Sequence, residues 1–200
     1  MTLYKKRERF QGFSAKVGNF FSKFGLSPNQ WTVITLIPAL ITMYFLIKQD
    51  FLLAAVFFII TAFIDIIDGS VARVAGKATK LGAYLDTIVD RYVEAIIVFG
   101  LIFASLPNFY IPAYAWIFLY FLGSFMTTYA KSAASEKGLV KKELRGGLLE
   151  RADRMLLLFV GFLAAILNPL YLTYIIVLLA VLTNISALQR IYTAIRSRNG

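Results

Sequence analysis

Long apolar runs alternate with short polar breaks along most of this 200-residue chain. Six of the runs reach the length of about 20 residues that an α-helix needs to cross a bilayer. They cover residues 28–47, 51–73, 81–105, 111–134, 148–167 and 170–192. Short turns at Gln49-Asp50, Pro107-Asn108 and Asn168-Pro169 separate pairs of them. The pattern predicts an all-α integral membrane protein with six transmembrane helices.

The 25 residues before the first predicted span have a different pattern. Apolar residues recur every three or four positions among basic and polar ones, which is typical of an amphipathic helix in the membrane interface. The apolar positions are Phe10, Phe13, Val17, Phe20, Phe21 and Phe24, and the basic ones are Lys5, Lys6, Arg7, Arg9, Lys16 and Lys23. The spread of basic residues argues against a secretory signal. The alternative is a helix packed on another part of the protein.

Ser27-Pro28 is expected to start the first span, with serine as the N-cap and proline in the first turn. Residues 1–25 and a bundle of residues 26–200 are then expected to form a single membrane domain, because the chain is too short for six spans and a further soluble domain.

The composition agrees with a membrane protein and limits its chemistry. Hydrophobic residues make up 59% of the chain and charged residues 16%, which is more apolar than ordinary soluble domains. The sequence contains no cysteine and no histidine. Disulfides, thiolate or imidazole metal ligands, a cysteine nucleophile and a histidine base are therefore excluded.

The distribution of the formal net charge of +10 predicts the topology. An even number of spans places both termini on one side, together with the loops at residues 74–80 and 135–147. These segments and the neighbouring span ends carry every lysine and arginine except Lys48. The positive-inside rule makes this side cytoplasmic, in a multi-pass protein of the cell membrane. Attraction to anionic membrane lipids explains the charge, and no nucleic-acid partner is needed.

Five carboxylates lie within otherwise apolar spans, where ionisable groups are costly and usually functional. Asp65 and Asp68 are one turn apart near the end of the second span, and Asp86, Asp90 and Glu94 follow at four-residue spacing in the third. The two spans are antiparallel, so these faces can meet. Oxygen ligands suit Mg²⁺, Mn²⁺ or Ca²⁺, and a two-metal site would relieve the repulsion. A polar network with Arg73 or Arg91, and a cation or proton pathway of a transporter, are the alternatives.

The residues from Asp65 to Asp90 form the pattern D-x2-D-G-x2-A-R-x8-G-x3-D-x3-D. This pattern resembles the signature of the CDP-alcohol phosphotransferase family. The resemblance implies transfer of a phosphoalcohol from a CDP-linked donor to a hydroxyl, with release of CMP. It also implies two Mg²⁺ ions, with Mn²⁺ possible, and a homodimer.

The resemblance also assigns roles to individual residues. Asp65, Asp68 and Asp86 would hold the metals, and Asp90 would both touch a metal and take the proton from the acceptor hydroxyl. The residues that would contact the CDP-lipid are Asn29, Gln30, Trp31, Thr32, Asp65, Gly69, Arg73 and Thr79.

Basic residues on other spans suggest the acceptor. Lys131, Arg151, Arg154 and Arg190 lie at the depth of the carboxylates, where an anionic ligand such as a phosphorylated acceptor explains them. Their contexts are similar to the inositol-phosphate-binding residues of the phosphatidylinositol-phosphate and archaetidylinositol-phosphate synthase branch. Side chains that snorkel at span ends are the alternative.

The sequence therefore favours transfer from CDP-diacylglycerol or CDP-archaeol to inositol 1-phosphate. A phosphatidylglycerophosphate synthase, whose acceptor is glycerol 3-phosphate, is the alternative within the family. A cation or proton transporter is the alternative from another class.

Overall fold

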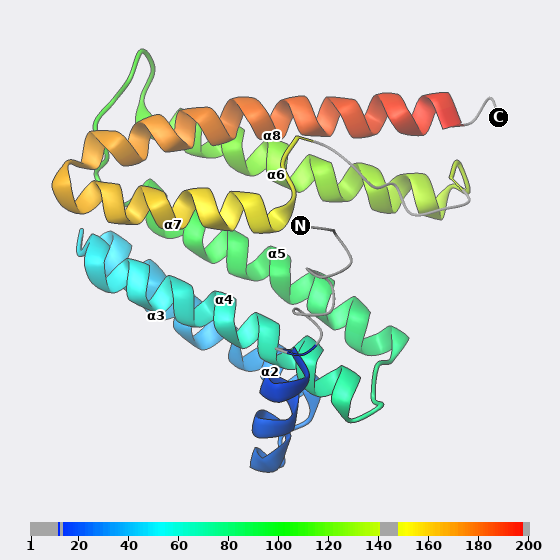
Figure 1. Cartoon of the computed structure of the whole chain (residues 1–200). Coiled ribbons are helices and arrows are strands. Elements are labelled where there is room, and N and C mark those ends of the chain that lie inside the picture. The colour runs from blue at the N-terminus through cyan, green and yellow to red at the C-terminus, as the bar shows by residue number, and fades with distance from the viewer. Residues whose placement is uncertain (1–11, 13, 141–147, 198–200) are drawn as a thin grey trace. The chain divides into compact units, whose positions relative to one another are not determined.

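The computed structural model describes residue 12 and residues 14–140 and 148–197 (Figure 1). Within these residues the secondary structure is helical, apart from an isolated bridge between Phe109 and Ile111. The elements are the 3-10 helix η1 (Ser22–Phe24) and the helices α2 (Pro28–Ile34), α3 (Leu36–Ile47), α4 (Phe51–Val74), α5 (Lys80–Ile102), α6 (Ala113–Glu136), α7 (Arg151–Leu167) and α8 (Pro169–Ser197). The all-α prediction is confirmed.

The first predicted span consists of two helices. α2 ends at Ile34 and α3 begins at Leu36, so the helix is interrupted at Thr35. Pro38 explains the break, because it has no N–H to donate to the carbonyl of Ile34. At the start of α2, the Ser27 hydroxyl accepts from the Gln30 N–H and the Gln30 side chain accepts from the Ser27 N–H. This reciprocal cap confirms the predicted helix start.

Length and composition qualify three segments of the described residues to cross a membrane: Pro28–Ile47, Phe51–Val74 and Pro169–Arg196. The chain is thus an integral membrane protein with several candidate spans. α5 is less apolar because it carries Asp86, Asp90, Arg91 and Glu94, and α7 has only 17 residues.

The chain divides into two compact units. Unit 1 comprises residues 1–43 and 56–97, and it contains the helix at residues 14–21, η1, α2 and most of α3, α4 and α5. Its apolar centre is formed by Val17, Trp31, Ile67 and Val71. Val17 and Phe21 therefore pack inward, whereas Phe20 and Phe24 are exposed. Phe10, Phe13, Lys5, Lys6, Arg7 and Arg9 lie outside the described residues.

Unit 2 comprises residues 44–55 and 98–200. In this unit α6 and α7 both pack against α8 (Figure 1). Polar side chains of α8 reach main-chain oxygens of α6: Asn184 Nδ2 donates to Leu119 O at 2.9 Å, and Thr183 Oγ1 to Tyr120 O at 3.4 Å. In an apolar environment such bonds fix the register of two helices.

Candidate metal and nucleotide site

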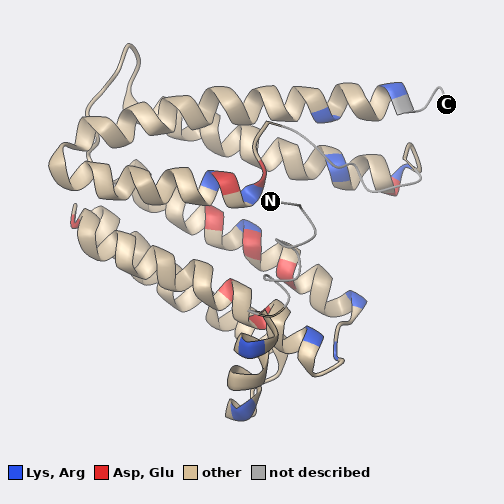
Figure 2. Cartoon of the chain, in the orientation of Figure 1, with Lys and Arg blue, Asp and Glu red and all other residues tan. Residues whose placement is uncertain are grey.

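Three aspartates of unit 1 bring their carboxylates together. Asp65 lies on α4, and Asp86 and Asp90 lie one turn apart on α5. One oxygen from each lies within 4.8 Å of the other two. Figure 2 shows the acidic residues of α4 and α5 in the same part of the unit. The predicted meeting of the two acidic faces is confirmed, and the all-oxygen donor set fits a divalent cation such as Mg²⁺ or Mn²⁺.

Asp68 lies near this group and has an oxygen available for a ligand. Its side chain is 6% exposed, and Oδ2 accepts no hydrogen bond from any residue that the structure describes. A buried carboxylate oxygen without a partner is costly. A cation at this position would remove that cost, so the residues present fit a metal site.

Glu94, the fifth carboxylate of the predicted cluster, has a different partner. It forms a salt bridge with Arg91, three residues earlier on α5. The Arg91 charge therefore offsets Glu94, while Asp65, Asp86 and Asp90 form the group of converging carboxylates.

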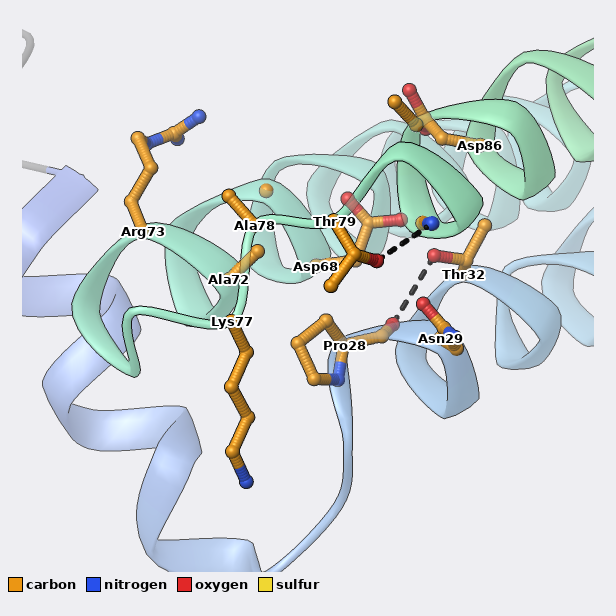
Figure 3. A pocket seen from close by; sticks show the side chains of 13 residues that line it. Pro28, Asn29, Thr32, Asp68, Ala72, Arg73, Lys77, Ala78, Thr79 and Asp86 are labelled. Carbon is orange, nitrogen blue, oxygen red and sulfur yellow. Dashed lines mark hydrogen bonds between the residues drawn. The ribbon is translucent and has the colours of Figure 1, made fainter.

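A polar pocket adjoins the aspartates (Figure 3). Asp68 and Asp86 line it, so Asp86 belongs both to the carboxylate group and to the pocket. The lining residues come from α2, the end of α4, the connection to α5 and the start of α5: Pro28, Asn29, Thr32, Asp68, Gly69, Ala72, Arg73, Lys77, Ala78, Thr79, Gly82, Ala83 and Asp86. Five of the residues predicted to contact the donor are among them: Asn29, Thr32, Gly69, Arg73 and Thr79.

Gln30, Trp31 and Asp65 were also predicted to contact the donor, and they lie elsewhere in unit 1. Gln30 caps the start of α2, and Trp31 packs in the apolar centre against Phe21. Asp65 belongs to the carboxylate group. The first two fix the helix that presents Asn29 and Thr32 to the pocket.

The two glycines of the motif make room for polar side chains. A Cβ at Gly82 would lie 3.2 Å from both Asn29 Oδ1 and Thr79 Oγ1, and a Cβ at Gly69 would lie 3.2 Å from Arg73 Nη1. Thr79 Oγ1 also accepts the N–H of Gly82 at 3.0 Å. The absence of side chains at these positions therefore lets Asn29, Thr79 and Arg73 approach the helices.

Lys77 is a lining residue that the sequence analysis missed. It lies in the short connection between α4 and α5. Figure 3 shows its side chain and that of Arg73 extending in opposite directions. A basic residue between two carboxylate-bearing helices was the available sequence signal.

The four basic residues predicted to bind the acceptor lie in unit 2. Lys131 is on α6, Arg151 and Arg154 are on α7, and Arg190 is on α8. Figure 2 shows basic residues on all three helices. The packing of α6 and α7 on α8 thus joins the helices that carry them.

Arg190 connects two of these helices. Its Nη1 atom donates to the main-chain oxygen of Thr127 on α6 at 2.9 Å. Arg154, which is 3% exposed, and Glu150 are its charged neighbours. Asp153 accepts the Glu150 N–H at 2.9 Å and so caps the start of α7.

Comparison with known proteins identifies the family. The sequence profile described as CDP-alcohol phosphatidyltransferase matches residues 26–186. The chain is 31% identical to the archaetidylinositol phosphate synthase of Pyrococcus horikoshii over 192 residues, which is 96% of each chain.

The fold is similar to crystal structures of Mycobacterium tuberculosis phosphatidylinositol phosphate synthase. The structure with CDP-DAG bound has a TM-score of 0.80 at 23% identity and is matched over 90% of this chain and 92% of that chain. The structure with manganese and citrate has a TM-score of 0.81 at 23% identity, over 90% and 88% of the two chains.

The fold and the acidic site define a helical membrane enzyme with a candidate divalent-metal centre. The chain belongs to the CDP-alcohol phosphatidyltransferase family. The resemblance inferred from the motif between Asp65 and Asp90 is therefore confirmed.

Proposed function

We propose that the protein transfers a diacylglycerol or archaeol phosphate group from a CDP-linked lipid to inositol 1-phosphate. A hydroxyl oxygen of the inositol attacks the phosphorus attached to the lipid. The bond from this phosphorus to the bridging oxygen breaks, and CMP leaves. The observation that carries the proposal is the convergence of the motif: Asp65, Asp86 and Asp90 form one group, and Asp86 also lines the pocket. The similarity to the Pyrococcus horikoshii synthase supports inositol phosphate as the acceptor.

The pocket of unit 1 binds the cytidine diphosphate of the donor in this proposal. Asn29, Thr32 and Thr79 supply polar groups, and Arg73 supplies a cationic fork for the diphosphate. Gly69 leaves space beside the Arg73 guanidinium. Gln30 and Trp31 act as positioning residues for α2.

Asp65, Asp68, Asp86 and Asp90 would hold two Mg²⁺ ions, with Mn²⁺ as the alternative. When bound, the ions supply charge neutralisation for the diphosphate during in-line transfer. The converging carboxylates and the unpartnered Oδ2 of Asp68 support this assignment.

Asp90 accepts the proton of the attacking inositol hydroxyl. The chain has no histidine to perform this step. Glu94 on the next turn is engaged by Arg91. Asp90 is therefore the carboxylate of α5 that we assign as the general base.

Lys131, Arg151, Arg154 and Arg190 bind the phosphate of the acceptor. The proximity of Arg154 and Arg190 supports the assignment, because two guanidinium groups repel each other and an anion between them would relieve the repulsion. The bond from Arg190 to the Thr127 main chain fixes the side chain while leaving other N–H groups for the ligand.

We further propose six membrane spans, formed by α2 with α3, α4, α5, α6, α7 and α8, and an interfacial helix within residues 1–25. The termini and the site face the cytoplasm, and the protein is a homodimer in the cell membrane. The outward-facing Phe20 and Phe24 support the interfacial helix. The family match over residues 26–186 crosses both units and supports a single functional domain.

An acceptor screen tests the reaction. The purified protein is given CDP-diacylglycerol or CDP-archaeol with Mg²⁺, and CMP release is measured with inositol 1-phosphate, glycerol 3-phosphate, serine or no acceptor. Inositol 1-phosphate is expected to give the fastest release. Release with glycerol 3-phosphate alone would assign the alternative synthase, and no release with any acceptor would contradict the reaction and leave transport as the alternative.

A further inference from the structure

The helix at residues 14–21 contacts the arginine of the motif. Ser14 Oγ accepts hydrogen bonds from Arg73 Nε at 3.2 Å and from Arg73 Nη2 at 2.8 Å. Nη2 also donates to Ser70 Oγ at 3.3 Å, and the two serine oxygens are 3.0 Å apart. A residue 59 positions earlier in the chain therefore holds the Arg73 guanidinium.

These contacts orient the guanidinium without cancelling its charge. Ser14 and Ser70 are buried and uncharged. Among the residues that the structure describes, Arg73 forms no salt bridge. A guanidinium has five N–H donors, and the two serines engage Nε and Nη2. Nη1 lies on the side of Gly69. The positive charge and the Nη1 donors therefore remain for an anionic ligand in the pocket that Arg73 lines.

The close packing of the same helix on α4 brings Ser14 within reach. A Cβ at Gly18 would overlap the main-chain oxygen of Ser70 and would lie 2.6 Å from Val74 Cγ2. One residue earlier, Val17 is buried with Ile67 and Val71 of α4. Any side chain at position 18 would push the helix outward and move Ser14 away from Arg73.

We propose that Ser14 is a positioning residue for Arg73, and that docking of the helix at residues 14–21 on the end of α4 sets the affinity for the nucleotide diphosphate of the donor. This inference rests on the proposed function, because it requires Arg73 to bind that diphosphate. It adds a residue outside the motif to the donor site. Ser14 touches neither substrate in this account and acts only through Arg73.

The test compares Ser14→Ala, Ser14→Thr and a matched control, Ser22→Ala. Ser22 is exposed on η1 and its hydroxyl donates to Asn19 O. Binding of CDP-diacylglycerol in detergent micelles, the KM values for both substrates and the Tm are measured. Ser14→Ala is expected to weaken donor binding about tenfold, because it removes the acceptor of two bonds from a charged group. The KM for inositol 1-phosphate and the Tm stay near wild type, Ser14→Thr restores binding, and Ser22→Ala has no effect.

A double-mutant cycle makes the test specific for Arg73. In an Arg73→Ala background, Ser14→Ala is expected to cause no further loss of donor binding. Gly18→Ala is an independent variant that should weaken donor binding in the same selective way. An equal loss from Ser14→Ala in both backgrounds, or a lowered Tm with unchanged donor affinity, would overturn the inference. Wild-type protein that binds no CDP-diacylglycerol would instead refute the proposed function and the inference with it.

Discussion

Arg91 and Glu94 form a salt bridge one turn apart on α5, on the helix that also carries Asp86 and Asp90. The exposed fractions of the two side chains are 19% and 8%. The pair balances one of the five carboxylates within the chain itself. The remaining charge is concentrated in the aspartates, where a divalent cation is the fitting partner.

Breaking this pair is predicted to destabilise the fold. Arg91→Gln leaves the buried Glu94 charge without its cation and should lower the free energy of unfolding by about 3 kcal/mol. The double variant Arg91→Gln/Glu94→Gln should recover much of the loss, because no charge is then left buried. The measurement is thermal unfolding in detergent.

The exposed pair of Glu136 and Lys137 is the control, since both side chains are 71% exposed. Lys137→Gln should change stability by less than about 1 kcal/mol. Equal effects at the two pairs would show that the Arg91 salt bridge has no special role.

Asp90 and Glu94 allow a matched comparison of two carboxylates on one helix. Asp90→Asn should reduce CMP release by at least about 100-fold, because it removes the base that accepts the hydroxyl proton. Glu94→Gln should retain most of the activity and lose stability, because Glu94 is engaged by Arg91. Rates are measured at saturating substrates, together with the Tm of each variant. A fully active Asp90→Asn enzyme would contradict the assigned base.

Much of the fold could be predicted from the sequence, because the apolar runs and their breaks are local signals. The breaks at Gln49-Asp50 and Asn168-Pro169 end helices within about two residues of the predicted positions. The interruption at Thr35 was missed, although Pro38 was a visible signal for it. The last helix continues beyond the predicted residue 192 to Ser197, because residues 193–197 are compatible with a helix and include no breaker.

The site was predictable where it depends on helical spacing. The i, i+4 spacing of Asp86 and Asp90 and the i, i+3 spacing of Arg91 and Glu94 place each pair on one helix face. The contact of Ser14 with Arg73 depends on how two distant helices pack, and no local pattern indicates it. The inward packing of Val17 and Phe21, with Phe20 turned outward, likewise depends on the helices beneath.

Removal of divalent metal is predicted to abolish activity. Treatment with EDTA should stop CMP release, and Mg²⁺ or Mn²⁺ should restore it. Mg²⁺ should also raise the Tm of the wild-type protein, because a ligand that binds the folded state stabilises it. Asp65→Asn should reduce this rise, since it removes one of the three converging carboxylates. Full activity in EDTA would exclude the proposed metal centre.

Arg190 is predicted to act on the acceptor. Arg190→Ala should raise the KM for inositol 1-phosphate about tenfold or more, because a charged donor to the phosphate is lost. The KM for the CDP-lipid should change little. Arg196→Ala, an exposed arginine in the last turn of the same helix, is the control and should change neither. Equal increases in both KM values for Arg190→Ala would indicate a general loss of structure.

Gly123 is predicted to be required for the packing of α6 on α8. A Cβ there would overlap Thr183 Oγ1 and lie 2.7 Å from the main-chain nitrogen of Asn184. Gly123→Ala should therefore destabilise the protein by about 1–3 kcal/mol. Gly161→Ala is the matched control, because its Cβ would meet the flexible end of Leu172 at 2.8 Å. Thermal unfolding should rank Gly123→Ala as the less stable variant, and the reverse order would contradict the packing argument.

The transfer of label from the acceptor into lipid tests the central claim most directly. The protein is incubated with CDP-diacylglycerol or CDP-archaeol, Mg²⁺ and inositol 1-[³²P]phosphate, and both the lipid phase and the CMP are quantified. The account predicts one mole of labelled lipid for each mole of CMP, with neither product formed by Asp90→Asn. CMP release while the label stays in the aqueous phase would contradict the account, because the lipid phosphate would then have been transferred to another acceptor.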